Sequence, residues 1–157
     1  MSAPMFVRRR SSRGFTLIEI LIVVIILGIL AAIVIPQFSS ASNDARKSNV
    51  QSTVQTLRSQ VALYKLQHQD TLPDLVTSWD QLILRSDATG STAPAAGVQT
   101  FGPYMQDTPT NSLNGKTNVV NGTGSVTTVC GFVYDYASGA GSGKVWGTDI
   151  DAKTILP

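Results

Sequence analysis

Few side chains in this 157-residue sequence could take part in chemistry. His68 is the only histidine and Cys130 the only cysteine, so the chain has neither a second imidazole for a histidine-based metal site nor an internal disulfide. We expect His68, at a predicted helix end, to be solvated or to cap that helix. Cys130 is expected to be a small buried residue on a strand. Since the spacing suggests no Cys–His pair, we do not expect an enzyme.

Two binding chemistries also find little support. The Gly-rich stretch 139–143 has no GK[ST] sequence and no following helix, as a phosphate-binding loop would need. Outside the N-terminal arginines the chain carries 8 basic and 10 acidic side chains, so no basic field remains and nucleic-acid binding is not expected. Asp135, Asp149 and Asp151 could supply oxygen ligands to Ca²⁺, but surface carboxylates are the simpler interpretation.

The acid that stands out is Glu19, because it lies inside a long apolar run. In residues 15–35 only Thr16 and Glu19 are polar. As an α-helix at roughly 1.5 Å per residue this run is about 31 Å long, which matches a bilayer core of about 30 Å. The apolar core of a secretory signal is shorter, at about 7–15 residues. The run therefore predicts a membrane-spanning helix.

The flanking charges predict how this helix is oriented. Four arginines precede the run, and the positive-inside tendency keeps their side of the membrane cytoplasmic; they are Arg8, Arg9, Arg10 and Arg13. A carboxylate in lipid costs about 2.5–3.5 kcal/mol on insertion scales, so Glu19 either has a partner or a task, or snorkels into the headgroups one turn from the cytoplasmic edge.

The sequence 14–19 (GFTLIE), with a short basic leader before it and Pro36 closing the apolar run, resembles the prepilin signal of type IV pilins and type II secretion pseudopilins. The resemblance covers about residues 8–50. It implies that a prepilin peptidase cuts between Gly14 and Phe15 and that the new amine of Phe15 is methylated. Glu19 would then pair with the amine of a neighbouring subunit, so that two groups costly in lipid neutralise one another.

The resemblance also implies a structural role in a filament. Subunits would stay in the inner membrane, with the N-terminus cytoplasmic and the C-terminal domain periplasmic, until an inner-membrane assembly platform moves them into a periplasmic or extracellular filament with other pilin-like subunits. The interval between Gly28 and Pro36 is the predicted weak point or break of the helix, which can extend in assembled filaments of the family. Some major pseudopilins bind calcium in a C-terminal loop, for which Asp149 and Asp151 are weak candidates here.

Three functions stay open at this point. The lone cysteine favours a major pseudopilin of the type II secretion system, used for protein export across the outer membrane, because many type IV pilins carry a C-terminal disulfide loop. The alternative is a type IV pilin used for adhesion, twitching motility or DNA uptake. A third possibility is a membrane-tethered domain that never polymerises, which would need neither Gly14 nor Glu19.

The chain divides by pattern into four regions. Residues 1–14 form a removable leader, and residues 15–36 form the transmembrane or filament-core helix. Residues 37–70 continue it as an amphipathic helix that ends near residues 68–70, before Pro73. Residues 71–157 form a periplasmic region of loops and strands. The helix stripe consists of Val50, Val54, Leu57, Val61 and Tyr64, widened by Leu63 and Leu66.

After the long helix, the sequence predicts few regular elements, and most of them are strands. A short helix is expected to begin at residues 78–81, with Ser78 as N-cap and Gln81 three residues on, and to bury residues 82–84 (LIL). A turn is expected at Asn114-Gly115. Strand-like segments cover residues 119–120, 126–136 and 144–148. The predicted fold class is therefore α+β and pilin-like, with a long N-terminal membrane-spanning helix packed on a small antiparallel sheet.

Overall fold

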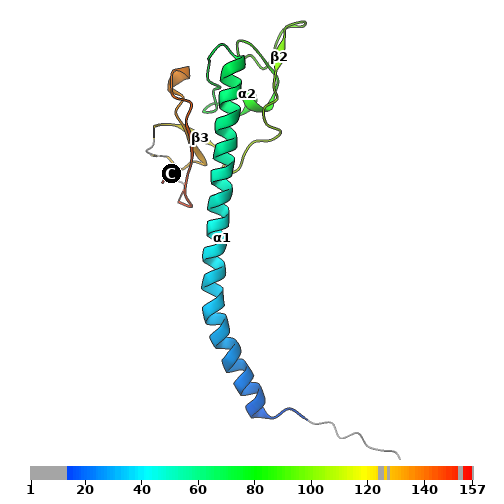
Figure 1. The fold of residues 1–157 in the computed structure, drawn as a ribbon, viewed down its shortest axis with the longest axis vertical. Helices are drawn as coiled ribbons and strands as arrows, with labels where there is room; N and C mark the ends of the chain where they lie inside the picture. The colour runs from blue at the N-terminus through cyan, green and yellow to red at the C-terminus, as the bar shows by residue number, and fades with distance from the viewer. Residues whose placement is uncertain (1–13, 124–125, 127, 152–153, 157) are drawn as a thin grey trace, which may run out of the picture. The chain divides into compact units, whose positions relative to one another are not determined.

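One long helix dominates the chain (Figure 1). The computed structural model describes residues 14–123, 126, 128–151 and 154–156. Helix α1 (Leu17–Gln67) has 51 residues. The chain separates into two compact units, Met1–Ala41 and Ser42–Pro157, and α1 gives its first half to one and its second half to the other.

The first half of α1 is apolar on every side. It is long and apolar enough to cross a membrane, as judged from length and composition, and its side chains from Leu17 to Phe38 are exposed in the isolated chain. Exposing a helix with no polar face to water is unfavourable, and such a helix is typically covered by lipid or by other helices. The basic leader lies outside the described residues.

The second half of α1 is amphipathic. Its buried residues are the five members of the predicted stripe. The prediction that Leu63 and Leu66 widen the stripe is wrong, because their side chains are 41% and 81% exposed. The helix ends where Gln69 and Asp70 take left-handed φ angles of 53° and 67°, a conformation that α-helical hydrogen bonding cannot continue.

Two small sheets follow α1. Strands β1 (Ser86–Asp87) and β2 (Thr100–Phe101) pair antiparallel. The second sheet has the order β3-β4-β5 and contains β3 (Val119–Asn121), β4 (Phe132–Tyr134) and β5 (Val145–Gly147). Strand β4 pairs antiparallel with β5 but parallel with β3. The predicted α+β class is confirmed, and the larger sheet is mixed. A 3₁₀ turn, η1 (Ala137–Gly139), lies between β4 and β5.

The core lies between α1 and the three-stranded sheet. Phe132, Tyr134 and Val145 face the buried stripe of the helix, and all three side chains are almost completely buried. Gly147 makes the closest approach, since a Cβ added there would overlap the Cγ1 of Val50. Only glycine lets β5 lie directly on the helix at this level.

The short helix begins later than predicted. Helix α2 (Asp80–Ile83) has Trp79 at its N-cap position without a side-chain cap. Ser78 Oγ accepts the N–H of Asp80 at 3.3 Å, while Gln81 accepts the N–H of Asp74 and donates to the carbonyl of Gly90. The proposed capping box at Ser78 is therefore wrong, because Gln81 ties α2 to two loops instead.

The C-terminal strands are tied together by buried amide and hydroxyl groups. Asn111 Nδ2 donates to the carbonyls of Gly131 and Thr148, both at 2.8 Å. Asn114 Nδ2 donates to Thr148 Oγ1 at 2.9 Å and to the carbonyl of Asp149 at 3.0 Å. Gly115 follows with a φ of 70°, at the predicted Asn114-Gly115 turn. This Asn–Thr cluster (Asn111, Asn114 and Thr148) joins segments that no disulfide connects.

Candidate functional site

The start of α1 is closed by a reciprocal pair of side chains. Thr16 precedes the first helical residue, and its Oγ1 accepts the N–H of Glu19 at 3.3 Å. In return, Glu19 Oε2 accepts the backbone N–H of Thr16 at 2.9 Å and its hydroxyl at 2.8 Å. This is a capping box, in which the residues at the N-cap and three positions later satisfy one another's free donors.

The capping box gives the acid in the apolar run an intramolecular partner. The carboxylate lies in the first turn of α1, where the helix dipole favours a negative charge. The two hydrogen bonds that it accepts from Thr16 replace part of the hydration that it loses in lipid. Thr16 was not predicted to have a role, although the spacing Thr-x-x-Glu before an apolar run is a recognisable signal for this box.

Gly14 and Phe15 stand next to the capping box without internal contacts that would explain their identity. The Phe15 side chain is 81% exposed. A Cβ added at Gly14 would meet nothing within 4 Å. Among the described residues, no neighbour therefore requires a glycine there.

Gly28 and Pro36 both lie inside α1. A Cβ added at Gly28 would also meet nothing within 4 Å. Helix α1 continues through both residues, so the predicted break is not present in the isolated chain. Ser40 Oγ donates to the carbonyls of Pro36 and Gln37 at 3.2 and 3.0 Å, which adds polar contacts just after the proline.

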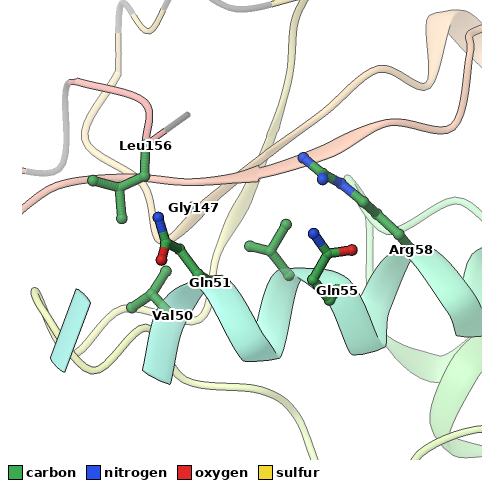
Figure 2. Close-up of a pocket in the computed structure, with 7 residues that line it drawn as sticks. Val50, Gln51, Gln55, Arg58, Gly147 and Leu156 are labelled. Atoms are coloured by element: carbon green, nitrogen blue, oxygen red, sulfur yellow. The ribbon is translucent and has the colours of Figure 1, made fainter. Parts of the chain in front are cut away.

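A hollow lies where α1 meets β5 (Figure 2). Val50 and Leu156 line one end and Arg58 stands at the other, with Gln51 and Gln55 along the helix between them. The guanidinium of Arg58 donates from Nε and Nη2 to the carbonyl of Val145, at 3.0 and 2.7 Å. Because β5 is an edge strand, this contact covers one of its free carbonyls. The hollow contains no nucleophile or acid–base pair.

The residues most often used in catalysis have structural partners. His68 is fully buried and stacks on Tyr64 with ring centroids 3.7 Å apart. Its Nδ1 is 2.9 Å from the carbonyl of Tyr64 in the last turn of α1, and its Nε2 is 2.9 Å from Ser86 Oγ. The helix-capping prediction for His68 is therefore confirmed and the solvated alternative is wrong. Cys130 is buried as expected, just before β4 rather than on a strand, and burial raises the pKa of its thiol.

The carboxylates considered for calcium lie in separate local networks. Asp135 Oδ2 accepts the hydroxyl and backbone N–H of Ser142, which lowers the pKa of its carboxyl group. Asp149 Oδ1 accepts the N–H of Ile150, and Asp151 Oδ1 accepts the N–H of Thr154. Within the part of the chain that the structure describes, no three His, Cys, Asp or Glu residues gather as metal ligands would.

Comparisons with known proteins identify the N-terminal segment. A family model described as the prokaryotic N-terminal methylation motif matches residues 9–35. Type II secretion system core protein G from Klebsiella michiganensis and from Pseudomonas aeruginosa are each 44% identical over 59 residues, which is 38% of this chain. The match spans only 42% of the length of either protein.

A third relative matches over most of its length. The type IV narrow pilus major component PilA5 from Thermus thermophilus is 33% identical over 115 residues, which is 70% of this chain and 95% of that protein. No solved structure matches the chain significantly. Three findings agree: a methylation motif lies on an exposed apolar helix, an α+β domain lies on the second half of that helix, and this match is long. The chain therefore belongs to the type IV pilin-like family, which includes the pseudopilins of type II secretion.

Proposed function

We propose that this protein is a structural subunit of a pilus-like filament, namely the pseudopilus of a type II secretion system. The observation that carries the proposal is the capping box of Thr16 and Glu19 at the start of an exposed apolar helix. This segment coincides with the methylation motif, and the same region matches the core protein G relatives. The filament would help to export proteins across the outer membrane.

Processing would convert the segment into an assembly site. A prepilin peptidase would cleave between Gly14 and Phe15, and the new amine of Phe15 would be methylated. The Glu19 carboxylate, which accepts hydrogen bonds from Thr16 in the isolated chain, is then available to the Phe15 amine of a neighbouring subunit. An ion pair in lipid is strongly favoured over two separate charges, so the exchange would set the register between subunits.

The bulk of the assembly energy would come from apolar packing. The side chains of Leu17, Ile18 and the rest of the first half of α1 are about half exposed or more in the isolated chain. In a filament these helices would cover one another, while the domain formed by Ser42–Pro157 would make up the outer surface. Before assembly the protein would reside in the inner membrane with its N-terminus cytoplasmic and its domain periplasmic. Its partners would be the assembly platform and other pilin-like subunits.

A type IV pilus on the cell surface is the second candidate function. It is favoured by the relative from Thermus thermophilus, because that match extends through the domain and not only through the N-terminal helix. The two functions differ in phenotype. Deleting the gene should abolish the release of secreted proteins if the filament is a pseudopilus, and should abolish surface fibres, adhesion or motility if it is a pilus.

The first experiment determines the N-terminus of the protein purified from its native membrane. Intact mass and N-terminal peptide spectrometry should find a chain that begins at Phe15 and carries one added methyl group. The Gly14→Leu variant should keep its leader, because a bulky side chain at the cleavage site would block the peptidase. Mature Phe15 termini in that variant would contradict the assignment of the cleavage site.

The second experiment separates a filament subunit from a simple membrane tether. Glu19→Ala should still insert and be cleaved, but it should form few filaments because the register pair is lost. Asp44→Ala is the matched control, since Asp44 is an exposed acid on α1 outside the apolar run, and it should assemble normally. Filaments of normal length and yield from Glu19→Ala would contradict the register role, and full function without filaments would favour the tether.

Calcium binding by Asp149 and Asp151 stays a prediction. We propose to test it by thermal unfolding of the detergent-solubilised chain with added Ca²⁺ or with a chelator. A site that binds only the folded domain would raise the melting temperature in proportion to the logarithm of free Ca²⁺. Identical melting curves under the two conditions would exclude a site of physiological affinity.

A further inference from the structure

A shallow groove runs between the last turns of α1 and the loop that leads into β5. Eight residues line it. We call the apolar ones the floor (Val61, Ala62, Leu72 and Gly143) and the cationic ones the rim (Arg58, Lys65 and Lys144); the remaining one is Ser142. Gly143 has a φ of 72°, and a Cβ there would press on Leu72. The absence of a side chain at Gly143 therefore lets the loop pack closely against Leu72 and Val61.

The three cations of the rim outnumber the two acids tied to the groove, which are Asp70 beside Lys65 and Asp135, whose carboxylate accepts hydrogen bonds from the lining residue Ser142. Arg58 uses two of its five N–H donors on the carbonyl of Val145 and has no carboxylate partner among the described residues. Lys144 is exposed and also has no such partner within the described part of the chain. Lys65 is 3.5 Å from Asp70, a highly exposed carboxylate, so that pair is screened by solvent. An apolar floor with this rim suits an apolar side chain flanked by acids.

The chain presents such a segment on its own surface. Ile150 is 63% exposed and stands between Asp149 and Asp151. The turn is fixed locally, because Asp149 N–H donates to the carbonyl of Thr154 at 2.7 Å and Asp149 Oδ1 accepts the N–H of Ile150 at 2.7 Å. Asp151 Oδ1 accepts the N–H of Thr154 at 3.2 Å. The acidic turn (residues 149–151) thus presents one exposed aliphatic side chain between two carboxylates that already accept local hydrogen bonds.

The acidic turn and the basic groove lie at different levels of the same domain. The segment that carries the turn packs near Val50, which Gly147 and Leu156 contact. The groove lies beside Ala62, roughly 18 Å further along α1 at 1.5 Å per residue. One copy therefore cannot fill its own groove. A contact between unlike patches of two copies is heterologous, and when repeated it gives a ring if the rotation closes and an open helical array if it does not.

We propose that the acidic turn of one copy docks in the basic groove of the next copy, with Ile150 on the apolar floor and Asp149 and Asp151 facing the cations. This inference rests on the proposed filament function and names one surface through which the domains would meet. The contact would lie outside the membrane, so it would add to the pairing at Glu19 and would weaken as ionic strength rises.

A charge exchange between the two surfaces tests the contact in the full-length protein. Lys144→Asp and Asp149→Lys should each lower filament yield roughly fivefold or more, since each replaces an attraction by a repulsion at every subunit junction. The double variant Lys144→Asp/Asp149→Lys should restore most of the yield, because the pair is present again with reversed sign. Lys116→Glu and Asp107→Lys reverse exposed charges outside both surfaces and serve as matched controls.

The outcomes are distinct. Wild-type yields from both single variants would overturn the inference, and so would a double variant that is no better than either single variant. Defects confined to Lys144→Asp, with normal Asp149→Lys filaments, would show that the groove holds another anionic group, such as a lipid phosphate, and would also overturn it. Each variant should keep the wild-type melting temperature within a few degrees, because Lys144 is exposed and Asp149 is only partly buried.

A second measurement separates failure of this contact from failure of the filament function. Carbodiimide treatment of the detergent-solubilised chain at high protein concentration should link Lys144 of one copy to Asp149 of another, and mass spectrometry should identify the joined peptides. Such cross-links from a protein that never forms filaments would support the contact and refute the filament. Filaments without the cross-link and without rescue by the charge exchange would refute the contact and leave the filament standing.

Discussion

Replacing Asn111 by alanine should greatly destabilise the domain. The Asn111 side chain is fully buried. Its Nδ2 donates to the carbonyls of Gly131 and Thr148 at 2.8 Å, and its Oδ1 accepts the N–H of Leu113 at 2.9 Å. The variant loses these three hydrogen bonds and leaves buried partners without them. At roughly 1 kcal/mol for each bond, the loss in unfolding free energy is about 3 kcal/mol.

This loss is large for a domain of this size. Small domains have unfolding free energies of about 5–15 kcal/mol, so a loss of about 3 kcal/mol removes a large fraction. The melting temperature should fall by roughly 10 °C. Tryptophan fluorescence of the full chain in detergent is a suitable assay, because Trp79 and Trp146 are the only two tryptophans and both lie in this domain. The apolar half of α1 then contributes no signal.

The matched control is Asn118→Ala. Asn118 also bonds through both side-chain atoms, donating to the carbonyl of Val129 at 3.1 Å and accepting the N–H of Gly131 at 3.2 Å. Because this residue is exposed, water can replace both partners, and we expect a loss under about 1 kcal/mol. If Asn111→Ala unfolds within 1 kcal/mol of the wild type, or no more easily than Asn118→Ala, the Asn–Thr cluster does not hold the strands together.

Three further predictions concern single side chains. Tyr134→Phe should leave stability unchanged or raise it, since the Tyr134 hydroxyl is buried and has no hydrogen-bond partner in the described part of the chain; a loss above about 1 kcal/mol in the fluorescence melt would contradict this. Gly147→Val should cost about 1–3 kcal/mol or more in the same melt, because the added atoms overlap Val50. The Asp135 carboxyl has a lowered pKa in the folded state because of its hydrogen bonds with Ser142. Its contribution to the free energy of unfolding is therefore present above the pKa that the group has in the unfolded chain, and is lost as the pH falls through its pKa in the folded state. Protease cleavage between β4 and β5 should therefore rise at acid pH in the wild type, whereas Asp135→Asn should already be cleaved at neutral pH.

The features that were predictable from the sequence depend on periodic patterns. The apolar run and the stripe from Val50 to Tyr64 follow directly from the spacing of apolar residues on a helix. Leu66 lies two residues after Tyr64, off the steps of three and four that define the stripe, and it is exposed because the domain covers only one side of α1. Local patterns therefore located the helix face but not the limits of its burial.

The features that were missed depend on contacts between distant segments. The parallel pairing of β3 with β4 depends on how the chain returns between them, and strand propensity carries no such information. His68 is buried because Tyr64, Phe101 and Tyr104 surround its ring, and two of these come from a separate loop. The capping box was an avoidable omission, since Thr16 and Glu19 stand at the required spacing in the sequence.

The burial of Cys130 has a consequence for where this domain can mature. The thiolate is the reactive form of cysteine, and a thiol whose pKa is raised by burial forms less of it at neutral pH. With no exposed surface, Cys130 is also shielded from oxidants and from the cysteines of other proteins. The oxidation state of Cys130 in the folded domain should therefore not depend on the redox potential of its surroundings. Its covalent structure would be the same in a reducing and in an oxidising compartment, without help from disulfide-forming enzymes and without mixed disulfides.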